Sequence, residues 1–265
     1  MIPSLRSAAD NCVMTNCKNK CCEESDLSHG VSGESLDGIN SVHIWRIFLD
    51  RDELSVQKLQ AVLSEEERDR SLKYRFEVDR NRFIVRRGML RRILAGYLRN
   101  EPQDVDFCAR TFGKLCLADL SRSLEFNVTH SQGMALIAVT QAGTIGVDVE
   151  CVRPLPDLEM MIESCLSPSE RVTLETFPAT SRLEYFYRYW TCKEAYLKAI
   201  GVGLDRPLTS VEVMMNDSSS EHPVTLRIAG EECPDFIVRS FVPFEGYVAA
   251  MATPEACIPH KLFEI

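Results

Sequence analysis

The chain has 265 residues, of which 45% are apolar, and its 39 acidic and 30 basic side chains give a net charge of −9. This length and apolar content suffice for one large or two small packed domains and argue against wholesale disorder. The acidic balance argues against general nucleic-acid binding, which requires a basic surface. No apolar run approaches the roughly 18 residues of a membrane span. The first residues lack the apolar core of a signal peptide, so we expect a cytoplasmic protein with no membrane partner.

Residues 1–40 differ from the rest in being polar and lacking apolar periodicity, so we expect a disordered tail. The tail holds four of the 11 cysteines, Cys12, Cys17, Cys21 and Cys22. Their spacing lacks the paired CxxC knuckles of zinc and iron–sulfur sites, so an oxidation-prone tail is favoured over a metal site. Most other cysteines are expected to be small buried apolar residues in a reducing compartment.

The next part of the chain alternates between strand and helix patterns. Residues 42–49 predict a strand, and Ser64 with Glu67 has the spacing of a capping box that begins a helix. A helical pattern then runs through residues 80–100 until Pro102 stops it. Short strands are expected after it, at 104–108, 124–128, 134–140 and 145–150.

The second half repeats this kind of alternation. Ser167, Pro168 and Glu170 have the pattern of a helix start, and a long helix is expected over 182–200, ended by Gly201. Strands are expected at 211–215, 224–228, 236–242 and 247–252. The fold class is therefore α+β, with two similar halves meeting near 142–144.

Two carboxylates stand out in the segment IGVDVE, residues 145–150. Asp148 and Glu150 share one face of the predicted strand because strand side chains alternate. Such a pair is costly to bury without a cation. A solvent-facing acidic strand end is the common alternative.

The segment WTCKEAYLKAIGVGL, residues 190–204, places Glu194 and Lys198 one helical turn apart. The spacing is that of a surface ion pair, but the aromatic residues around it predict a largely buried helix. Together with Asp148 and Glu150, Glu194 supplies three oxygen ligands of the kind that Mg²⁺ prefers. Such a set indicates a diphosphate substrate, whose phosphates Lys198 could contact.

Three further segments have side chains suited to anion binding. FNVTHSQG, residues 126–133, delivers Thr129 and His130 into a turn, although a lone histidine is more often structural. Gly113 and Lys114 lie in a turn where the lysine could bind a phosphate. The helix over 80–92 carries six arginines, most of them expected on a solvated face.

In this order, the segments NRFIVRRG, GK, FNVTHSQG, IGVDVE and WTCKEAYLKAIGVGL resemble the 4′-phosphopantetheinyl transferases of the surfactin-synthetase-activating type. The resemblance covers roughly residues 42–250, and the spelling of these segments is most similar to the cyanobacterial branch. The pairing of IGVDVE with W-x-x-K-E-A-x-x-K is what makes it specific. One departure is Leu115, where the family often has proline after the GK pair.

The resemblance implies an enzyme that moves the 4′-phosphopantetheine arm of coenzyme A to a serine of an apo acyl or peptidyl carrier protein. Adenosine 3′,5′-bisphosphate is released and Mg²⁺ is required. It also implies a monomer of two similar pseudo-symmetric subdomains, 41–142 and 143–255, with the ligand cleft between them and a C-terminal tail over 256–265.

The resemblance also implies roles for individual residues. It assigns metal binding to Asp148, Glu150 and Glu194. It assigns catalysis to Glu194 as the base, acting directly or through a water, and to Lys198 as the group at the leaving phosphate. Contacts with coenzyme A fall to Arg82, Gly113, Lys114, Thr129, His130, Asp148 and Lys198. Two alternatives stay open, a non-catalytic carrier-binding module and a Mg²⁺-dependent hydrolase of a diphosphate. Carrier recognition needs an exposed apolar patch, for which residues 157–166 are a candidate unless their methionines are core.

Overall fold

The computed structural model describes residues 41–265 except 111–112, 120, 122, 203–205, 216–222, 229–230, 233–234 and 255–259. The expected tail over 1–40, with its four cysteines, lies outside the described residues. The described part is a mixture of helices and mainly antiparallel sheets, which confirms the α+β class. None of its helices is long and apolar enough to cross a membrane.

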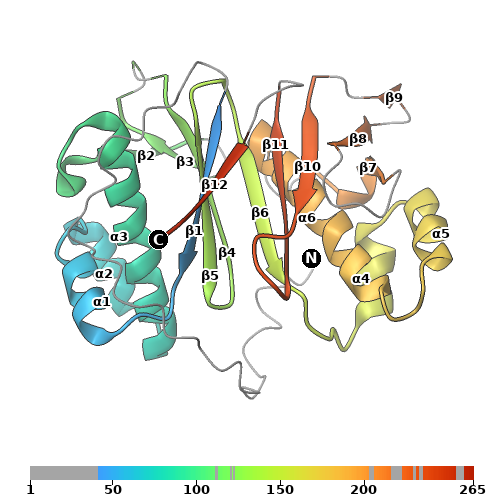
Figure 1. Ribbon diagram of the computed structural model, residues 1–265, viewed down its shortest axis with the longest axis horizontal. Helices are drawn as coiled ribbons and strands as arrows, with labels where there is room; N and C mark the ends of the chain where they lie inside the picture. The colour runs from blue at the N-terminus through green and yellow to red at the C-terminus, as the bar shows by residue number, and fades with distance from the viewer. Residues whose placement is uncertain are drawn as a thin grey trace.

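The first half of the described chain forms one sheet with three helices on its outer face (Figure 1). Its elements are β1 (Val42–Phe48), α1 (Glu53–Gln60), α2 (Glu65–Leu72), α3 (Glu77–Leu98), the 3-10 turn η1 (Pro102–Asp104), β2 (Phe107–Ala109), β3 (Leu115–Leu117), β4 (Glu125–Ser131) and β5 (Met134–Thr140). The second half forms the other large sheet and its helices, and it ends in one further strand of the first sheet. Its elements are β6 (Gly146–Cys151), α4 (Leu158–Cys165), α5 (Pro168–Thr176), α6 (Arg182–Ile200), η4 (Leu208–Ser210), β7 (Val211–Met214), β8 (Pro223–Ile228), β9 (Glu231–Glu232), β10 (Ile237–Phe241), β11 (Tyr247–Thr253) and β12 (His260–Glu264).

The strands pair in two large sheets and one hairpin. The first sheet has the order β12-β1-β5-β4, and the second has the order β6-β11-β10-β8-β7, with β9 added to β8. The strands β2 and β3 form a separate two-stranded ribbon. In this arrangement β4 and β6 are edge strands of their sheets, and the two edges lie against each other.

Three apolar clusters stack the elements as helix, sheet, sheet and helix. Odd-numbered residues of β1, such as Trp45 and Ile47, pack with α1 and α3, whereas Val42 and Ile44 face the second sheet. On β6, Val147 and Val149 meet them in the cluster between the sheets. The outer face of the second sheet packs against α6 and α4. The alternation of strand side chains therefore builds both faces of each sheet.

Local sequence signals account for several helix ends. Ser64 with Glu67 and Ser167 with Glu170 each form the predicted capping box, in which side chain and backbone N–H bond in both directions. The long helix ends at Gly201 with φ of 73°, a left-handed conformation that glycine adopts without strain. The predicted bounds of this helix, 182–200, are confirmed.

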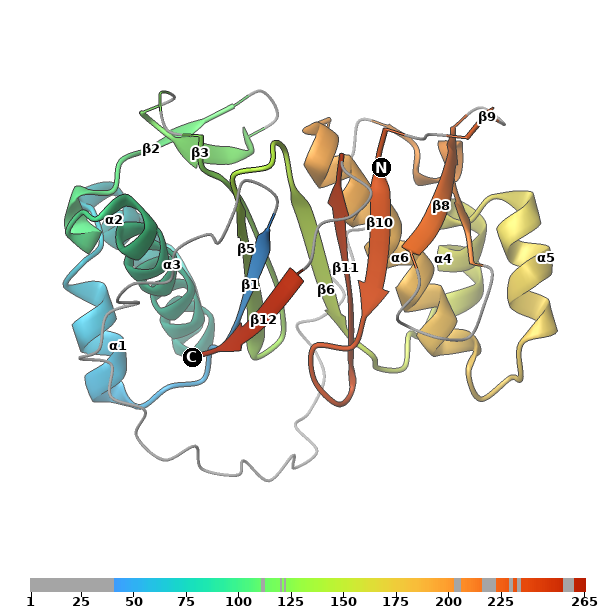
Figure 2. The ribbon, with the colours of Figure 1, turned by 45° about the horizontal axis from the view of Figure 1, so that its top comes forward.

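Two expectations about the chain differ from the structure. The segment 256–265 was expected to be a tail, but β12 lies beside β1 (Figure 2) and pairs with it in parallel. This pairing stacks the Phe263 ring on the Trp45 ring. The arginines of α3 were expected to be mostly solvated, but each is at least half-buried. Arg91, for example, donates to Glu67 at 2.6 Å and to backbone carbonyls near η1. The pairing of β12 and the burial of these arginines both depend on contacts between distant segments, which local periodicity does not show.

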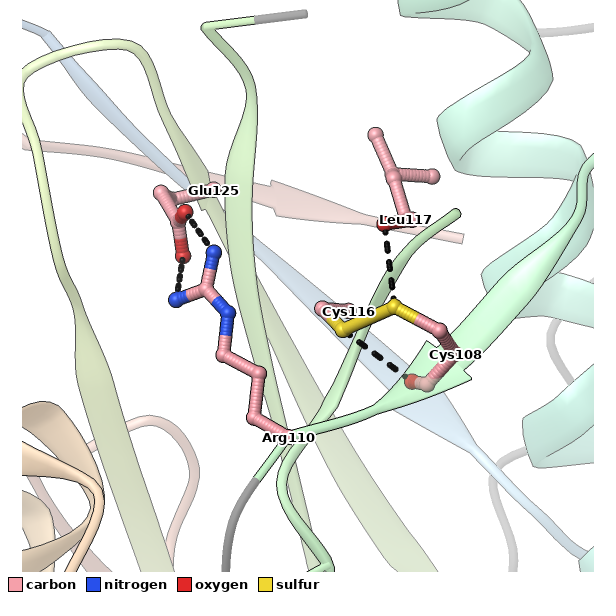
Figure 3. The surroundings of a disulfide bond; sticks show 5 residues. All are labelled: Cys108, Arg110, Cys116, Leu117 and Glu125. Carbon is pink, nitrogen blue, oxygen red and sulfur yellow. Dashed lines mark hydrogen bonds and ion pairs between the residues drawn. A yellow bond between two sulfur atoms is a disulfide. The ribbon is translucent and has the colours of Figure 1, made fainter. Parts of the chain in front are cut away.

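The β2–β3 ribbon carries a disulfide between Cys108 and Cys116, directly opposite each other on the two strands (Figure 3). Nearby, Arg110 forms a two-pronged ion pair with Glu125 of β4. From the sequence, most cysteines are expected to be small buried apolar residues, whereas these two are joined by a disulfide. The free cysteines Cys165 and Cys192 are buried, as expected.

Candidate functional site

The candidate site forms where β6 meets α6, and Gly146 makes the contact possible. A Cβ atom at Gly146 would lie 1.9 Å from the carbonyl oxygen of Ala195 and 2.4 Å from the amide nitrogen of Ala199. Only a residue without a side chain allows so close an approach. The even-numbered positions of β6, including Asp148 and Glu150, therefore share the strand face on which α6 packs.

Asp148 and Lys198 form the charged centre of the site. The Lys198 ammonium donates to Asp148 Oδ1 at 2.5 Å, to the Val147 carbonyl at 3.2 Å and to Thr129 Oγ1 at 3.3 Å. Thr129 in turn donates to Asp148 Oδ1 at 2.9 Å, and Asp148 is buried. Lys198 thus pairs with Asp148 of β6. This pairing differs from the surface ion pair with Glu194 that the sequence spacing indicated.

Three side chains of β4 connect this strand to β6, and we call them the polar seam: Asn127, Thr129 and Ser131. Asn127 Oδ1 accepts from the Val147 N–H at 3.0 Å. Ser131 Oγ accepts from the Cys151 N–H at 3.1 Å and donates to Glu150 Oε2 at 2.7 Å. The seam therefore satisfies backbone groups of an edge strand, as a further strand would do, and reaches both carboxylates of the pair.

The predicted metal ligands are only partly assembled. Within the described part of the chain, no three His, Cys, Asp or Glu side chains lie close enough together to hold a metal ion. Asp148 and Glu150 do lie on one face of β6, and Glu194 is half-buried on α6, one turn before Lys198. The buried Asp148 Oδ2 has no hydrogen-bond partner among the described residues. A buried carboxylate oxygen without a donor is a suitable ligand for a hard cation.

The residues predicted to contact the phosphates do not all lie beside Asp148 and Lys198. Lys114 lies at the β2–β3 turn, after Gly113 with φ of 76°, and its ammonium donates to the carbonyl oxygens of Lys198 at 2.9 Å and Ile145 at 3.1 Å. It therefore caps the C-terminal end of α6 and links the two halves. Burial lowers the pKa of Lys114.

Arg82 and His130 also lie apart from the Asp148–Lys198 pair. Arg82 donates to both oxygens of Asp50, at 2.7 and 3.0 Å, and this hydrogen bonding raises the pKa of Arg82. His130 is half-buried on β4, on the strand face opposite Thr129. Contacts of these residues with coenzyme A stay a prediction.

Lys193 is a buried residue whose role the sequence did not show. Its ammonium donates to Glu170 Oε2 at 2.6 Å and to the carbonyls of Cys165 and Leu208 at 2.8 and 3.0 Å. Burial lowers the pKa of Lys193 and raises that of Glu170, while the ion pair opposes both shifts. Glu170 also accepts from the Val213 N–H, so this pair fixes α5, α6 and β7 together. The available signal was a lysine within the aromatic-rich part of a helix that is expected to be largely buried.

The candidate docking segment over 157–166 has a mixed surface. Met160 is 52% exposed, whereas Met161 and Leu166 are buried in the core beneath α4. Met160 is therefore exposed, as a docking patch requires, whereas Met161 belongs to the core.

Comparison with known proteins agrees with the family resemblance. The family model of the 4′-phosphopantetheinyl transferase superfamily matches residues 144–252, which include β6 and α6. The chain is 40% identical to the 4′-phosphopantetheinyl transferase HetI of Nostoc sp., covering 80% of this chain and 87% of the relative. It is 37% identical to a putative 4′-phosphopantetheinyl transferase of Synechocystis sp., over 63% of this chain and 68% of the relative.

A more distant relative is the 4′-phosphopantetheinyl transferase Sfp of Bacillus subtilis, at 24% identity over 83% of this chain and 95% of that protein. The higher identities belong to cyanobacterial proteins, as the spelling of the motifs predicted. The chain is thus an enzyme of the 4′-phosphopantetheinyl transferase superfamily, of the Sfp type and similar to its cyanobacterial members.

Proposed function

We propose that this enzyme transfers the 4′-phosphopantetheine arm of coenzyme A to a serine of an apo acyl or peptidyl carrier protein, releasing adenosine 3′,5′-bisphosphate in a Mg²⁺-dependent reaction. The observation that carries the proposal is the cluster of the buried Asp148 and Thr129 with the half-buried Lys198, where β4, β6 and α6 meet. A carboxylate and an ammonium held together at the junction of two subdomains suit a charged diphosphate better than a neutral ligand.

The proposed Mg²⁺ ligands are Asp148, Glu150 and Glu194. The buried and unpartnered Asp148 Oδ2 supports this, because it leaves one oxygen open while Lys198 neutralises the other. Since the three carboxylates do not form a cluster in the described structure, the proposal requires them to draw together on ion binding. When bound, the ion would offset negative charge on the diphosphate.

The remaining steps fall to side chains of this chain. Glu194 is proposed to accept the proton of the carrier serine, whose oxygen forms the new bond to the β-phosphorus. The bond from that phosphorus to the bridging oxygen breaks, and Lys198 stabilises the charge on the leaving bisphosphate. Thr129 and His130 are proposed to contact the 3′-phosphate, and Lys114 and Arg82 the nucleotide. Lys114 and Arg82 would exchange their present bonds to do so.

We also propose that the two subdomains comprise residues 41–142 and 143–255, with coenzyme A bound between them to a monomer. The polar seam and the contacts of Lys114 with α6 support a site between the two halves, because they cross from one half to the other.

Intact-protein mass spectrometry tests the transfer directly. Incubation with coenzyme A, Mg²⁺ and an apo acyl carrier protein should add one phosphopantetheine to the carrier, and EDTA should abolish the gain. Asp148→Ala should lose transfer while keeping the wild-type circular dichroism spectrum, because it removes a proposed metal ligand and little core volume. Near-normal transfer by this variant would refute the metal assignment. Release of free phosphopantetheine without a carrier would instead identify a hydrolase.

A further inference from the structure

Different side chains of the polar seam contact the backbone of β6 and its two carboxylates. Asn127, Thr129 and Ser131 alternate along β4, so all three side chains project from one face toward β6. Asn127 contacts the strand through the Val147 N–H. Thr129 and Ser131 each donate to one carboxylate, Asp148 and Glu150 respectively. The strand of one subdomain thus holds acidic side chains of the other.

Ser131 makes two contacts at once, and together they fix its hydroxyl. It accepts from the Cys151 N–H at 3.1 Å, which orients the oxygen, and donates its proton to Glu150 Oε2 at 2.7 Å. A glutamate side chain has three rotatable bonds, so a single charge-assisted bond from a fixed donor restricts it strongly. Ser131 itself is buried, which keeps water from replacing the bond.

We propose that Ser131 is a positioning residue that holds the Glu150 carboxylate beside Asp148 for cation binding. The inference rests on the proposed function, because it assigns Glu150 to the metal. Hydrogen bonds to metal-ligating carboxylates orient the ligand, and removing one weakens metal affinity by about 10–100-fold. The role differs from that of Asn127, whose amide oxygen accepts from a backbone N–H of the same strand.

This difference supplies a matched control. Ser131→Ala and Asn127→Ala each remove one side-chain acceptor of a β6 backbone N–H, but only Ser131→Ala removes a donor to Glu150. Ser131→Thr keeps the hydroxyl and serves as the conservative variant. The measurements are Mn²⁺ affinity by electron paramagnetic resonance in the presence of coenzyme A, the Mg²⁺ concentration for half-maximal transfer, and the melting temperature.

We expect Ser131→Ala to weaken Mn²⁺ binding and raise the half-saturating Mg²⁺ concentration by about tenfold or more. Ser131→Thr should restore most of both, and Asn127→Ala should lower the melting temperature while leaving the metal response near wild type. Equal metal responses in Ser131→Ala and Asn127→Ala would overturn the inference, as would wild-type Mn²⁺ affinity in Ser131→Ala. A wild-type enzyme that transfers nothing or binds no Mn²⁺ would refute the proposed function itself, before any variant is compared.

Discussion

Substituting Gly146 by alanine should separate the two elements that carry the candidate site. An added Cβ would lie 1.9 Å from the Ala195 carbonyl oxygen, whereas ordinary contacts of this kind begin at 3.4 Å. The overlap of 3.4 − 1.9 = 1.5 Å involves backbone atoms of α6, which cannot rotate away. Either α6 retreats from β6 or β6 bends, and both separate Lys198 from Asp148.

The magnitude follows from this overlap. Overpacking a core costs about 1–3 kcal/mol and occasionally more, and a clash with helix backbone belongs at the upper end. A loss of about 3 kcal/mol corresponds to a melting temperature lower by roughly 6–12 °C for a chain of this size. Because a misplacement of about 1 Å can reduce catalysis by about 100-fold, transfer should fall by at least that factor at temperatures where the variant is folded.

The assay combines thermal unfolding with the initial rate of carrier modification, measured well below the melting temperature. Gly88→Ala in α3 is the matched control, since its Cβ would lie 2.8 Å from Leu59 Cβ, in the core under α1 and away from β6. The control should lose stability and keep near-normal transfer. If Gly146→Ala retains both the wild-type melting temperature and the wild-type rate, the close approach of β6 and α6 is wrong.

Three further predictions concern stability. The Cys108–Cys116 disulfide closes a loop with a sequence separation of 8. Its reduction, or replacement of both cysteines by serine, should lower the free energy of unfolding by roughly 2.5 kcal/mol. A reductant that does not lower the melting temperature would contradict this. Lys193→Met leaves Glu170 buried without its ion-pair partner, so urea unfolding should show a loss of about 3–5 kcal/mol; a change below about 1 kcal/mol would argue against the buried pair. Burial raises the pKa of Cys192 from 9.0 to about 12 and that of Tyr187 from 10.0 to about 12. The folded state thus favours the protonated form of both side chains. Their contribution to stability should be complete below about pH 9 and decline from there to about pH 12. An unfolding free energy that stays constant across this window would contradict the prediction.

Local patterns were enough to predict most elements and the order of the motifs. The capping boxes at Ser64 and Ser167 and the end of α6 at Gly201 depend on residues three or four positions apart, which the sequence shows directly. The alternation in IGVDVE likewise predicted that Asp148 and Glu150 share a face, and the structure confirms this on β6. The proposed roles of these residues stay predictions.

Contacts between distant segments were not visible in the same way. The strand β12 was missed because its pairing partner lies more than 200 residues earlier, and a short strand has little periodicity of its own. The arginines of α3 were misplaced because their partners, such as Glu67 and Asp50, come from other elements. The disulfide between Cys108 and Cys116 depends on the register of a short hairpin, which spacing alone does not fix.

The sequence by itself determined the α+β class, the family and the list of candidate residues, because these depend on composition, local periodicity and the order of short motifs. The tertiary structure decided which of those residues meet. It paired Lys198 with Asp148, placed Lys114 at the end of α6 and Arg82 on Asp50, and brought Ser131 to Glu150. Each of these contacts joins segments at least 19 residues apart, so it depends on how distant elements pack and not on local sequence.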